Sequence, residues 1–438
     1  MEAHPVALDQ NMWVAGTILV VAYGLIFSEV LHRTSAAIIG AVLMVGIGTW
    51  HGFYTQAGAV QAIDANTMLL LAGMMMVVVL LRPTGGFEYL AIRIAKFSKG
   101  SPLRLLVYLS LAVSVISMFL DNVTTVLIFA PLTVLITRIL GINPMPYLIS
   151  EAMLSNIGGA ATLVGDPPNI MIGSAAGIDF NRFLIHLGPL IAVVWVATVA
   201  VLSLLFRREL RSRPKQLVDL DERSAITDPA GLRRALFALG LIILLFFVHH
   251  HLDLYPAYVA FIGVAIALAL LRPQPEQLFA KMEWSVLMFF AALFIIVGGV
   301  EASGLLALVG QQLAGFAHDS GRLLITGLVL MWVAAVMSAV VDNIPFTVTM
   351  IPIVLGLEQQ GVSVAPLWWA LAIGVGLGGN GTHIGATANV ICVAESERCG
   401  IPEAAITPMG WLRTGLPTTL FSLVVASVLY ALFFDWFA

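Results

Sequence analysis

Polar side chains that could bind ions stand inside long apolar stretches at four places, as two matching pairs. Asp121-Asn122 and Asp342-Asn343 form one pair. The other pair is the glycine-rich segments 158–169 and 378–389, which share three glycines, a threonine and a final asparagine at almost the same offset along the chain. Carboxylates, amides and free backbone carbonyls can bind cations, protons or small hydroxylated solutes. The sequence therefore predicts a ligand site built from two copies of one unit.

The predicted site consists of the polar side chains in and around these segments. The candidate ligand-binding residues are Asp121, Asn122, Thr124, Asn156, Thr162, Asp166, Asn169, Asp342, Asn343, Thr347, Asn380, Thr382 and Asn389. The glycines that allow close backbone approach are Gly158, Gly159, Gly165, Gly378, Gly379 and Gly385. Candidates for proton coupling are Asp121, Asp166 and Asp342, together with His383. No lysine or arginine stands in these segments, so the site is expected to lack a positive side chain.

Each candidate also has a structural explanation. Asp121 and Asp342 could simply cap the helices that follow them. Asp166 could belong to a surface Asp-Pro turn, and His383 could be a packing residue. The glycines alone could serve helix packing. Asp166 has no acidic counterpart, because Ala386 stands at the matching position of the second segment.

Several other chemistries are excluded by the pattern. The string at residues 374–379 matches a dinucleotide fingerprint, but that motif has meaning only between a strand and a helix. Leu163 stands where an aspartyl intramembrane protease requires glycine, so we expect no enzyme activity. No Walker-type phosphate loop is present, and Cys392 and Cys399 have neither disulfide-framework nor metal-ligand spacing. We expect no cofactor and no bound metal, with H⁺ or Na⁺ as the coupling ion.

The composition indicates a membrane protein. The chain is 60% hydrophobic and 11% charged, whereas soluble domains carry about 25% charged residues. Apolar runs that approach ~20 residues are read as membrane spans. In the first half these are residues 13–31, 34–50, 66–82, two arms at 103–119 and 123–139, a broken span at 147–178 and a last span at 183–206. The second half repeats the order at 236–252, 257–271, 284–300, arms at 322–340 and 344–357, a broken span at 366–394 and a last span at 411–434.

Amphipathic or intervening segments at 87–99 and 302–319 precede the two arm pairs. We therefore divide the chain into a first repeat, 1–206, a basic linker, 207–235, and a second repeat, 236–438. Each repeat has five crossings if its arm pair re-enters, and full crossing of both arms would add an even number, so the second repeat is inverted relative to the first in either case. Length and charge leave open whether the arm pairs, 103–139 and 322–357, cross the membrane fully or re-enter. Histidines 249–251 are expected to be solvated, and Trp368 and Trp369 to anchor at the membrane surface.

Basic residues concentrate on one side of this topology. The positive-inside rule makes that side the cytoplasm, with the linker inside and both termini outside. Arg33 is one of these basic residues. We expect a multi-pass protein of the inner (plasma) membrane that contacts lipid. Nucleic-acid binding by the basic linker is disfavoured against this topological explanation.

These residues carry a family resemblance over nearly the whole chain. Segments 121–125, 156–169, 342–347 and 378–389 resemble the ArsB/NhaD permeases of the ion transporter superfamily, and most of all bacterial relatives of the melanosomal P protein. The resemblance implies an all-α polytopic membrane protein of two inverted repeats, each with five crossings, one re-entrant hairpin and a broken helix at the site. It also implies a homodimer with a scaffold and a mobile transport domain that moves like an elevator.

The expected function is secondary active transport coupled to protons. A site with carboxylates, amides and hydroxyls but no positive side chain suits a neutral hydroxylated solute, so export of arsenite or antimonite is the first hypothesis. Association with a separate ATPase subunit is left open. A Na⁺/H⁺ antiporter or a cation-coupled anion carrier resembling dicarboxylate carriers is the alternative. The Asp-Asn tips replace the Ser-Asn-Thr tips of dicarboxylate carriers, which argues against sodium-dicarboxylate transport.

Overall fold

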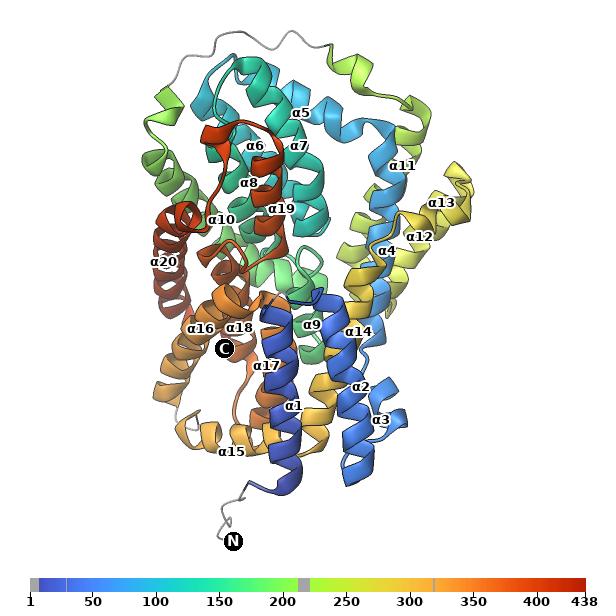
Figure 1. Ribbon diagram of the computed structural model, residues 1–438, viewed down its shortest axis with the longest axis vertical. Coiled ribbons are helices and arrows are strands. Elements are labelled where there is room, and N and C mark those ends of the chain that lie inside the picture. The colour runs from blue at the N-terminus through green and yellow to red at the C-terminus, as the bar shows by residue number, and fades with distance from the viewer. Residues whose placement is uncertain (1–7, 29, 212–220, 318–319) are drawn as a thin grey trace.

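The computed structural model describes residues 8–28, 30–211, 221–317 and 320–438, and the described chain is helical throughout (Figure 1). The first-half helices are α1 (Gln10–Phe27), α2 (Arg33–His51), α3 (Gln56–Gln61), α4 (Ala65–Leu81), α5 (Gly86–Phe97), α6 (Pro102–Ser117), α7 (Asn122–Leu140), α8 (Met145–Gly159), α9 (Pro167–Ala176) and α10 (Phe180–Leu205). The second-half helices are α11 (Pro229–Val248), α12 (Pro256–Leu271), α13 (Pro275–Ala280), α14 (Trp284–Ala302), α15 (Leu305–Ala317), α16 (Ser320–Val341), α17 (Asn343–Gln359), α18 (Ala365–Gly378), α19 (Thr387–Arg398), α20 (Pro408–Leu432) and α21 (Phe434–Phe437). Short 3₁₀ turns complete the chain at η1 (Arg82–Thr84), η2 (Glu209–Arg211), η3 (Glu222–Ala225), η4 (His249–Leu252), η5 (Gly379–Gly381) and η6 (Pro402–Ala404).

Helix boundaries follow from capping residues in the sequence. The carboxylate of Asp64 accepts from the N–H groups of Asn66 and Thr67 at the start of α4, and Asp179 caps α10 in the same way. Gly141 ends α7 in the left-handed conformation, which costs glycine little. Eight helices among the described residues are long and apolar enough to cross a membrane. The four halves of the broken spans are too short to cross alone, since a crossing takes about 20 residues.

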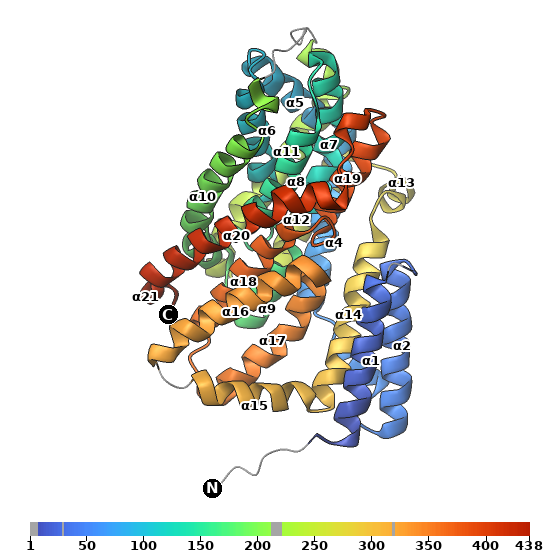
Figure 2. The ribbon, with the colours of Figure 1, turned by 60° about the vertical axis from the view of Figure 1, so that its left-hand side comes forward.

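Outside the core lie two groups of three helices, and each group contains helices from both repeats. Helix α14 of the second repeat packs against α2, beside α1, and α4 of the first repeat packs against α12, beside α11. In Figure 1 α4, α11 and α12 lie on the right-hand side, and Figure 2 shows α1, α2 and α14 together along one edge. Each group takes its third helix from the other repeat, so neither repeat can form its outer group alone.

The remaining long helices form a core of hairpins, broken helices and the final helices α10 and α20. The hairpins are α6–α7 and α16–α17, and the broken helices are α8–α9 and α18–α19. The second half of each broken helix packs on the hairpin of the other repeat, α19 on α7 and α9 on α17. The intervening helices α5 and α15 lie at opposite ends of the molecule in Figure 1.

The hairpin tips are buried, which decides between the two topologies that the sequence left open. Asn122 and Asn343 at the tips are only 3% and 5% exposed. A loop joining two full crossings would lie at the surface, because buried loops carry backbone groups that are hard to satisfy. Both arm pairs are therefore re-entrant hairpins whose tips bond to the broken helices, Asn122 to Asn156 and Asn343 to Asp166.

The end of the linker is attached to α5. Lys96 Nζ lies 2.5 Å from Glu222 Oε2, and Arg93 Nη1 lies 3.3 Å from Glu222 Oε1. These bonds, the Lys96 bond above all, lower the pKa of Glu222 from 4.5 to about 2. Gly85, in the left-handed conformation, lies directly under the linker, where a Cβ would overlap Ala225 O. Residues 212–220 of the linker and residues 1–7 lie outside the described residues, so the cytoplasmic placement of the linker and the outer placement of the termini stay predictions.

Three sequence expectations were wrong. Helix α11 begins at Pro229, capped by Asp228, so the last residues of the predicted linker are helical. Trp368 and Trp369 are 3% and 1% exposed, because α18 is surrounded by the core and does not reach the lipid. Of the three histidines expected to be solvated, His250 and His251 are exposed, but His249 is only 4% exposed. Its Nδ1 bonds to Leu254 O at 2.8 Å, and its Nε2 accepts from Phe180 N at 3.3 Å.

Candidate functional site

The N-termini of four helices converge at the centre of the core. These are α7, α9, α17 and α19, one from each hairpin and one from each broken helix. Asn343 at the start of α17 donates to both carboxylate oxygens of Asp166, at the start of α9, at 3.3 and 3.2 Å. A helix N-terminus carries a partial positive charge, so the four together favour an anion or a carboxylate between them.

A chain of asparagine amides joins the two repeats beside these N-termini. Asn122 Nδ2 donates to Asn156 Oδ1 at 2.9 Å, and Asn156 Nδ2 donates to Asn380 Oδ1 at 2.8 Å and to Asn389 Oδ1 at 3.1 Å. All four side chains are at most 3% exposed. A buried amide must find partners, and these amides find one another. We call this set the amide bridge.

The two breaks have the same internal geometry, as the repeated motif predicts. Asn169 Nδ2 donates to Gly159 O at 3.2 Å and to Thr162 O at 2.9 Å. Asn389 Nδ2 donates to the matching carbonyls, those of Gly379 and Thr382, at 2.8 Å each. These asparagines thus satisfy carbonyls that the unwound helix leaves free.

Threonines and glycines attach each break to the hairpin of its own repeat. Thr162 Oγ1 donates to Met118 O, and Thr382 Oγ1 donates to Ala339 O at 2.5 Å. A Cβ on Gly158 would overlap Ser114 O, and one on Gly378 would overlap Ala335 O. The same crowding occurs inside each break, where Gly165 and Gly385 meet the glycine carbonyls of Gly159 and Gly379. The glycines therefore allow the backbone of each break to approach the backbone of its hairpin, as well as the other side of the same break.

Asp121 and Asp342 occupy matching positions but differ in their hydrogen bonds. Asp121 accepts from the N–H and the hydroxyl of Thr124, at 2.8 and 2.6 Å, as an ordinary helix cap. The residue that matches Thr124 is Pro345, which has neither group. Asp342 instead has a positive φ of 75°, which is uncommon outside glycine. Its carboxylate accepts from the adjacent Asn343 N at 2.7 Å. Helix capping therefore explains the hydrogen bonds of the Asp121 carboxylate, whereas the Asp342 carboxylate makes only one such bond.

Asp166 is 1% exposed and does not cap its own helix. Its carboxylate points instead to Asn343 of the other repeat, and the charges of Asp342 and Asp121 act on it. The expected alternative, a surface turn, is therefore wrong. We call the three aspartates, all of which were candidate residues, the acidic cluster.

Arg33 is the residue that sequence reasoning missed. It lies at the start of α2, and its Nη1 is 3.6 Å from Asp342 Oδ2 and donates to Thr387 Oγ1 at 2.7 Å. The expectation of a site without a positive side chain was wrong, because Arg33 is far from both of its partners in the sequence. The sequence signals that could have found it are Pro345, which leaves Asp342 without capping groups, and an arginine at the start of an apolar span.

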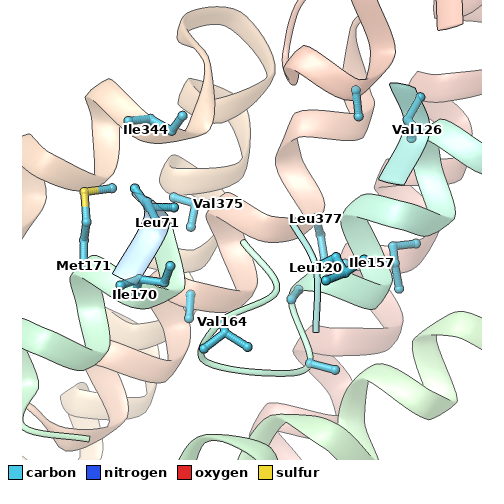
Figure 3. Close-up of a cluster of buried hydrophobic side chains, with 14 of the residues drawn as sticks. Leu71, Leu120, Val126, Ile157, Val164, Ile170, Met171, Ile344, Val375 and Leu377 are labelled. Carbon is cyan, nitrogen blue, oxygen red and sulfur yellow. The ribbon is translucent and has the colours of Figure 1, made fainter. Parts of the chain in front are cut away.

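The remaining predicted residues lie at the edges of the site. Thr347 Oγ1 donates to Asn343 O at 2.7 Å within α17, and the hydroxyl of Thr124 donates to the carboxylate of Asp121. His383 is half-buried in the segment before α19. Apolar side chains of both repeats line the surroundings: Figure 3 shows Leu120 and Ile157 of the first repeat beside Leu377 of the second.

Two acceptor atoms at the site have no hydrogen-bond partner. Asn122 Oδ1 and Asn169 Oδ1 are buried and unpaired among the described residues. Buried acceptors without a protein partner are rare, and these two oxygens are free to accept a bond from a bound ion or solute. Farther along α9 and α17, a cavity of about 290 Å³ lies between these helices and α14, lined by Ser174, Val348 and Glu301 among others.

Comparison with known proteins agrees with a transporter. The family model described as "Citrate transporter" (CitMHS) matches residues 23–374. A 46 kDa membrane protein of Mycobacterium leprae is 40% identical over 426 residues, which cover 95% of this chain and 97% of that protein. An uncharacterized transporter of Mycobacterium tuberculosis is 40% identical over 427 residues, with the same coverage.

More distant relatives are consistent with this. The human P protein is 31% identical over 503 residues, which cover 96% of this chain and 59% of the P protein. The crystal structure of the YdaH transporter of Alcanivorax borkumensis has a TM-score of 0.58 and 15% identity and covers 98% of each chain, so the fold is shared. The expected kinship with the P protein is confirmed, whereas the narrower ArsB/NhaD placement stays a prediction. By its matched family model and its mycobacterial relatives, the chain belongs to the citrate transporter (CitMHS) family of the ion transporter superfamily.

Proposed function

We propose that this protein is a secondary transporter that carries a small polycarboxylate such as citrate together with cations or protons. The observation that carries the proposal is the convergence of four helix N-termini on one buried site. Half-helix N-termini that point at the anionic groups of a substrate are a recurrent construction in transporters. The citrate transporter family provides the substrate class.

The charge of the site makes coupling necessary. Three aspartates face one arginine, so the ionised site carries an excess of negative charge. A polycarboxylate would be repelled unless protons or cations neutralised the aspartates first. The unpaired acceptors Asn122 Oδ1 and Asn169 Oδ1 are oxygen ligands of the kind that Na⁺ takes, and they support a cation site in the first repeat.

Arsenite or antimonite export is the second candidate. The specific observation in its favour is the amide bridge, a buried polar group without charge that suits a neutral hydroxylated solute. Arg33 weakens this candidate, because the absence of a positive side chain was its original basis.

We further propose that the core moves against the two outer groups as an elevator, in a homodimer. The interleaved outer groups support a rigid scaffold, since each contains helices of both repeats. The amide bridge supports a core that moves as one body, because it fastens the two broken helices together.

Transport by the purified full-length protein in proteoliposomes tests the proposal. Uptake of citrate, of sodium and of arsenite is measured in parallel under an imposed pH gradient or sodium gradient. Gradient-driven citrate uptake is the expected result. Movement of arsenite without citrate would instead establish the second candidate and refute the first.

Substitutions in the acidic cluster test the site. Asp166→Asn and Asp342→Asn should abolish gradient-driven uptake, and Asp121→Asn should reduce it. Asp179→Asn is the matched control, because Asp179 caps α10 outside the site. Unchanged coupling in both Asp166→Asn and Asp342→Asn would remove the acidic cluster from the mechanism.

A further inference from the structure

Arg33 connects an outer group to the core. It belongs to α2, which packs against α1 and α14, and its guanidinium lies over the ring of Phe289 of α14, 5.5 Å from the ring centre. Its polar partners, Asp342 and Thr387, begin α17 and α19 of the core. Any sliding of the core against the outer group must therefore break these two contacts.

Both core partners of Arg33 belong to the second repeat, and the matching residues of the first repeat could not take their place. The residue that matches Thr387 in the first repeat is Pro167, which has no hydroxyl. The residue that matches Asp342 is Asp121, which is bound by Thr124. Pro345 leaves Asp342 without those capping groups, and the positive φ of Asp342 accompanies its ion pair with Arg33.

The charges around this ion pair can be named from each neighbouring element. Arg33 of α2 faces Asp342 directly, and Asp342 in turn acts on Asp166 of α9. Glu283, at the start of α14, interacts with Arg33, with Arg82 and with Asp121. The outer group therefore keeps Phe289 against Arg33 and supplies Glu283 as the nearby carboxylate when Arg33 loses Asp342.

On the basis of the proposed function, we propose that Arg33 is a latch between the outer group and the core. While Asp342 is charged and the site is empty of cations, Arg33 holds Asp342 and Thr387 and the core stays in place. A proton or cation on Asp342 removes the attraction, Arg33 turns to Glu283 and Phe289, and the core is free to move. The latch thereby forbids movement without the coupling ion, which is the requirement for coupled transport.

Distance measurement between two spin labels tests the latch without a transported substrate. The labels are placed at Trp50 of α2 and Val390 of α19, which are 90% and 45% exposed. The buried native cysteines, Cys392 and Cys399, are replaced by alanine. The full-length protein is examined in lipid nanodiscs at pH 8 without sodium, at pH 5, and at pH 8 with sodium. The wild type should show one distance in the first condition and a second distance that grows in the other two.

Arg33→Gln should show the second distance already at pH 8 without sodium, with the ratio of the two populations changed about fivefold or more, the usual lower bound for coupled sites. Arg33→Lys keeps the charge and should retain the dependence on pH. Pro345→Thr supplies the N–H and hydroxyl that Asp342 lacks, so it should act like Arg33→Gln while leaving Arg33 in place. Arg104→Gln, at an exposed position of α6, is the control and should match the wild type.

The latch is overturned if Arg33→Gln and Pro345→Thr both keep the wild-type distances in all three conditions. Weakened citrate binding by Arg33→Gln with unchanged distances would also overturn it, and would assign Arg33 to the substrate. If the wild-type protein transports no carboxylate, the proposed function fails, but the distances still report on the latch because no substrate is present.

Discussion

Asn156 is the centre of the amide bridge, and Asn156→Asp tests whether that bridge holds the two repeats together. The substitution keeps the shape of the side chain and the acceptor that faces Asn122. It replaces the donating nitrogen by an oxygen that faces Asn380 Oδ1, now 2.8 Å away, and Asn389 Oδ1, now 3.1 Å away. Two donated hydrogen bonds become two contacts between acceptors.

The magnitude follows from the number of acceptors left unpaired. Leaving a buried acceptor without its donor costs about 1–3 kcal/mol, so the two together should cost roughly 2–6 kcal/mol. Asn156 is 1% exposed, so water offers little compensation. Part of the loss should return on acidification, because a protonated aspartic acid donates one hydrogen bond.

The assay is the apparent melting temperature of the detergent-purified protein at pH 8 and pH 5, with citrate uptake measured alongside. Asn156→Asp should melt well below the wild type at pH 8 and closer to it at pH 5. The control is Asn181→Asp, which loses a single hydrogen bond, to Phe247 O at 2.6 Å, and should shift the melting temperature little at either pH. Equal melting temperatures of Asn156→Asp and wild type at pH 8 would show that the amide bridge does not stabilise the core.

Further predictions concern close approach and the linker. Gly378→Ala should destabilise the protein by about 1–3 kcal/mol, because overpacking against backbone forces the chain to shift. Its Cβ would overlap Ala335 O, whereas Gly356→Ala, with no atom within 4 Å, should be neutral or slightly stabilising in the same melting assay. Destabilisation by both alanines alike would contradict the packing. The low pKa of Glu222 predicts that attachment of residues 221–228 to α5 is complete above about pH 4.5 and is lost as the pH falls toward 2. Hydrogen exchange of this segment should show that dependence in the wild type, and Glu222→Gln should abolish it. Gly85→Ala should loosen the same segment at neutral pH, seen as faster exchange, because its Cβ would overlap Ala225 O; wild-type exchange would show that the contact is not close.

Features that repeat in the sequence were predictable. The two breaks, the matching Asp-Asn positions and the close approach of the glycines were predicted from the nearly constant offset between the two repeats, because a duplicated unit repeats its geometry with its residues. The offset did not decide whether the Asp-Asn positions are tips of re-entrant hairpins. Asp166 was noticed because the second repeat has no acidic residue at the matching position, but its pairing with Asn343 was not predicted.

Features that depend on contact between distant elements were not predictable. Arg33 was counted as a topology signal, because nothing near it in the sequence says that α2 begins beside α17. Trp369 was assigned to the membrane surface because aromatic residues are common there. In the structure the ring of His186 of α10 stacks on it, 4.6 Å between ring centres. Such contacts depend on the tertiary arrangement, which periodicity does not contain.

The amide bridge has a consequence for the transport cycle. Its four members are asparagines, whose side chains neither gain nor lose a proton across the physiological range, and no step of loading alters their charge. The bonds between the two repeats are thus insensitive to a proton gradient, whereas the aspartates that we propose respond to it lie beside them. In such a carrier the charge of the site can change in every transport cycle, while the hydrogen bonds that hold the two broken helices together stay the same.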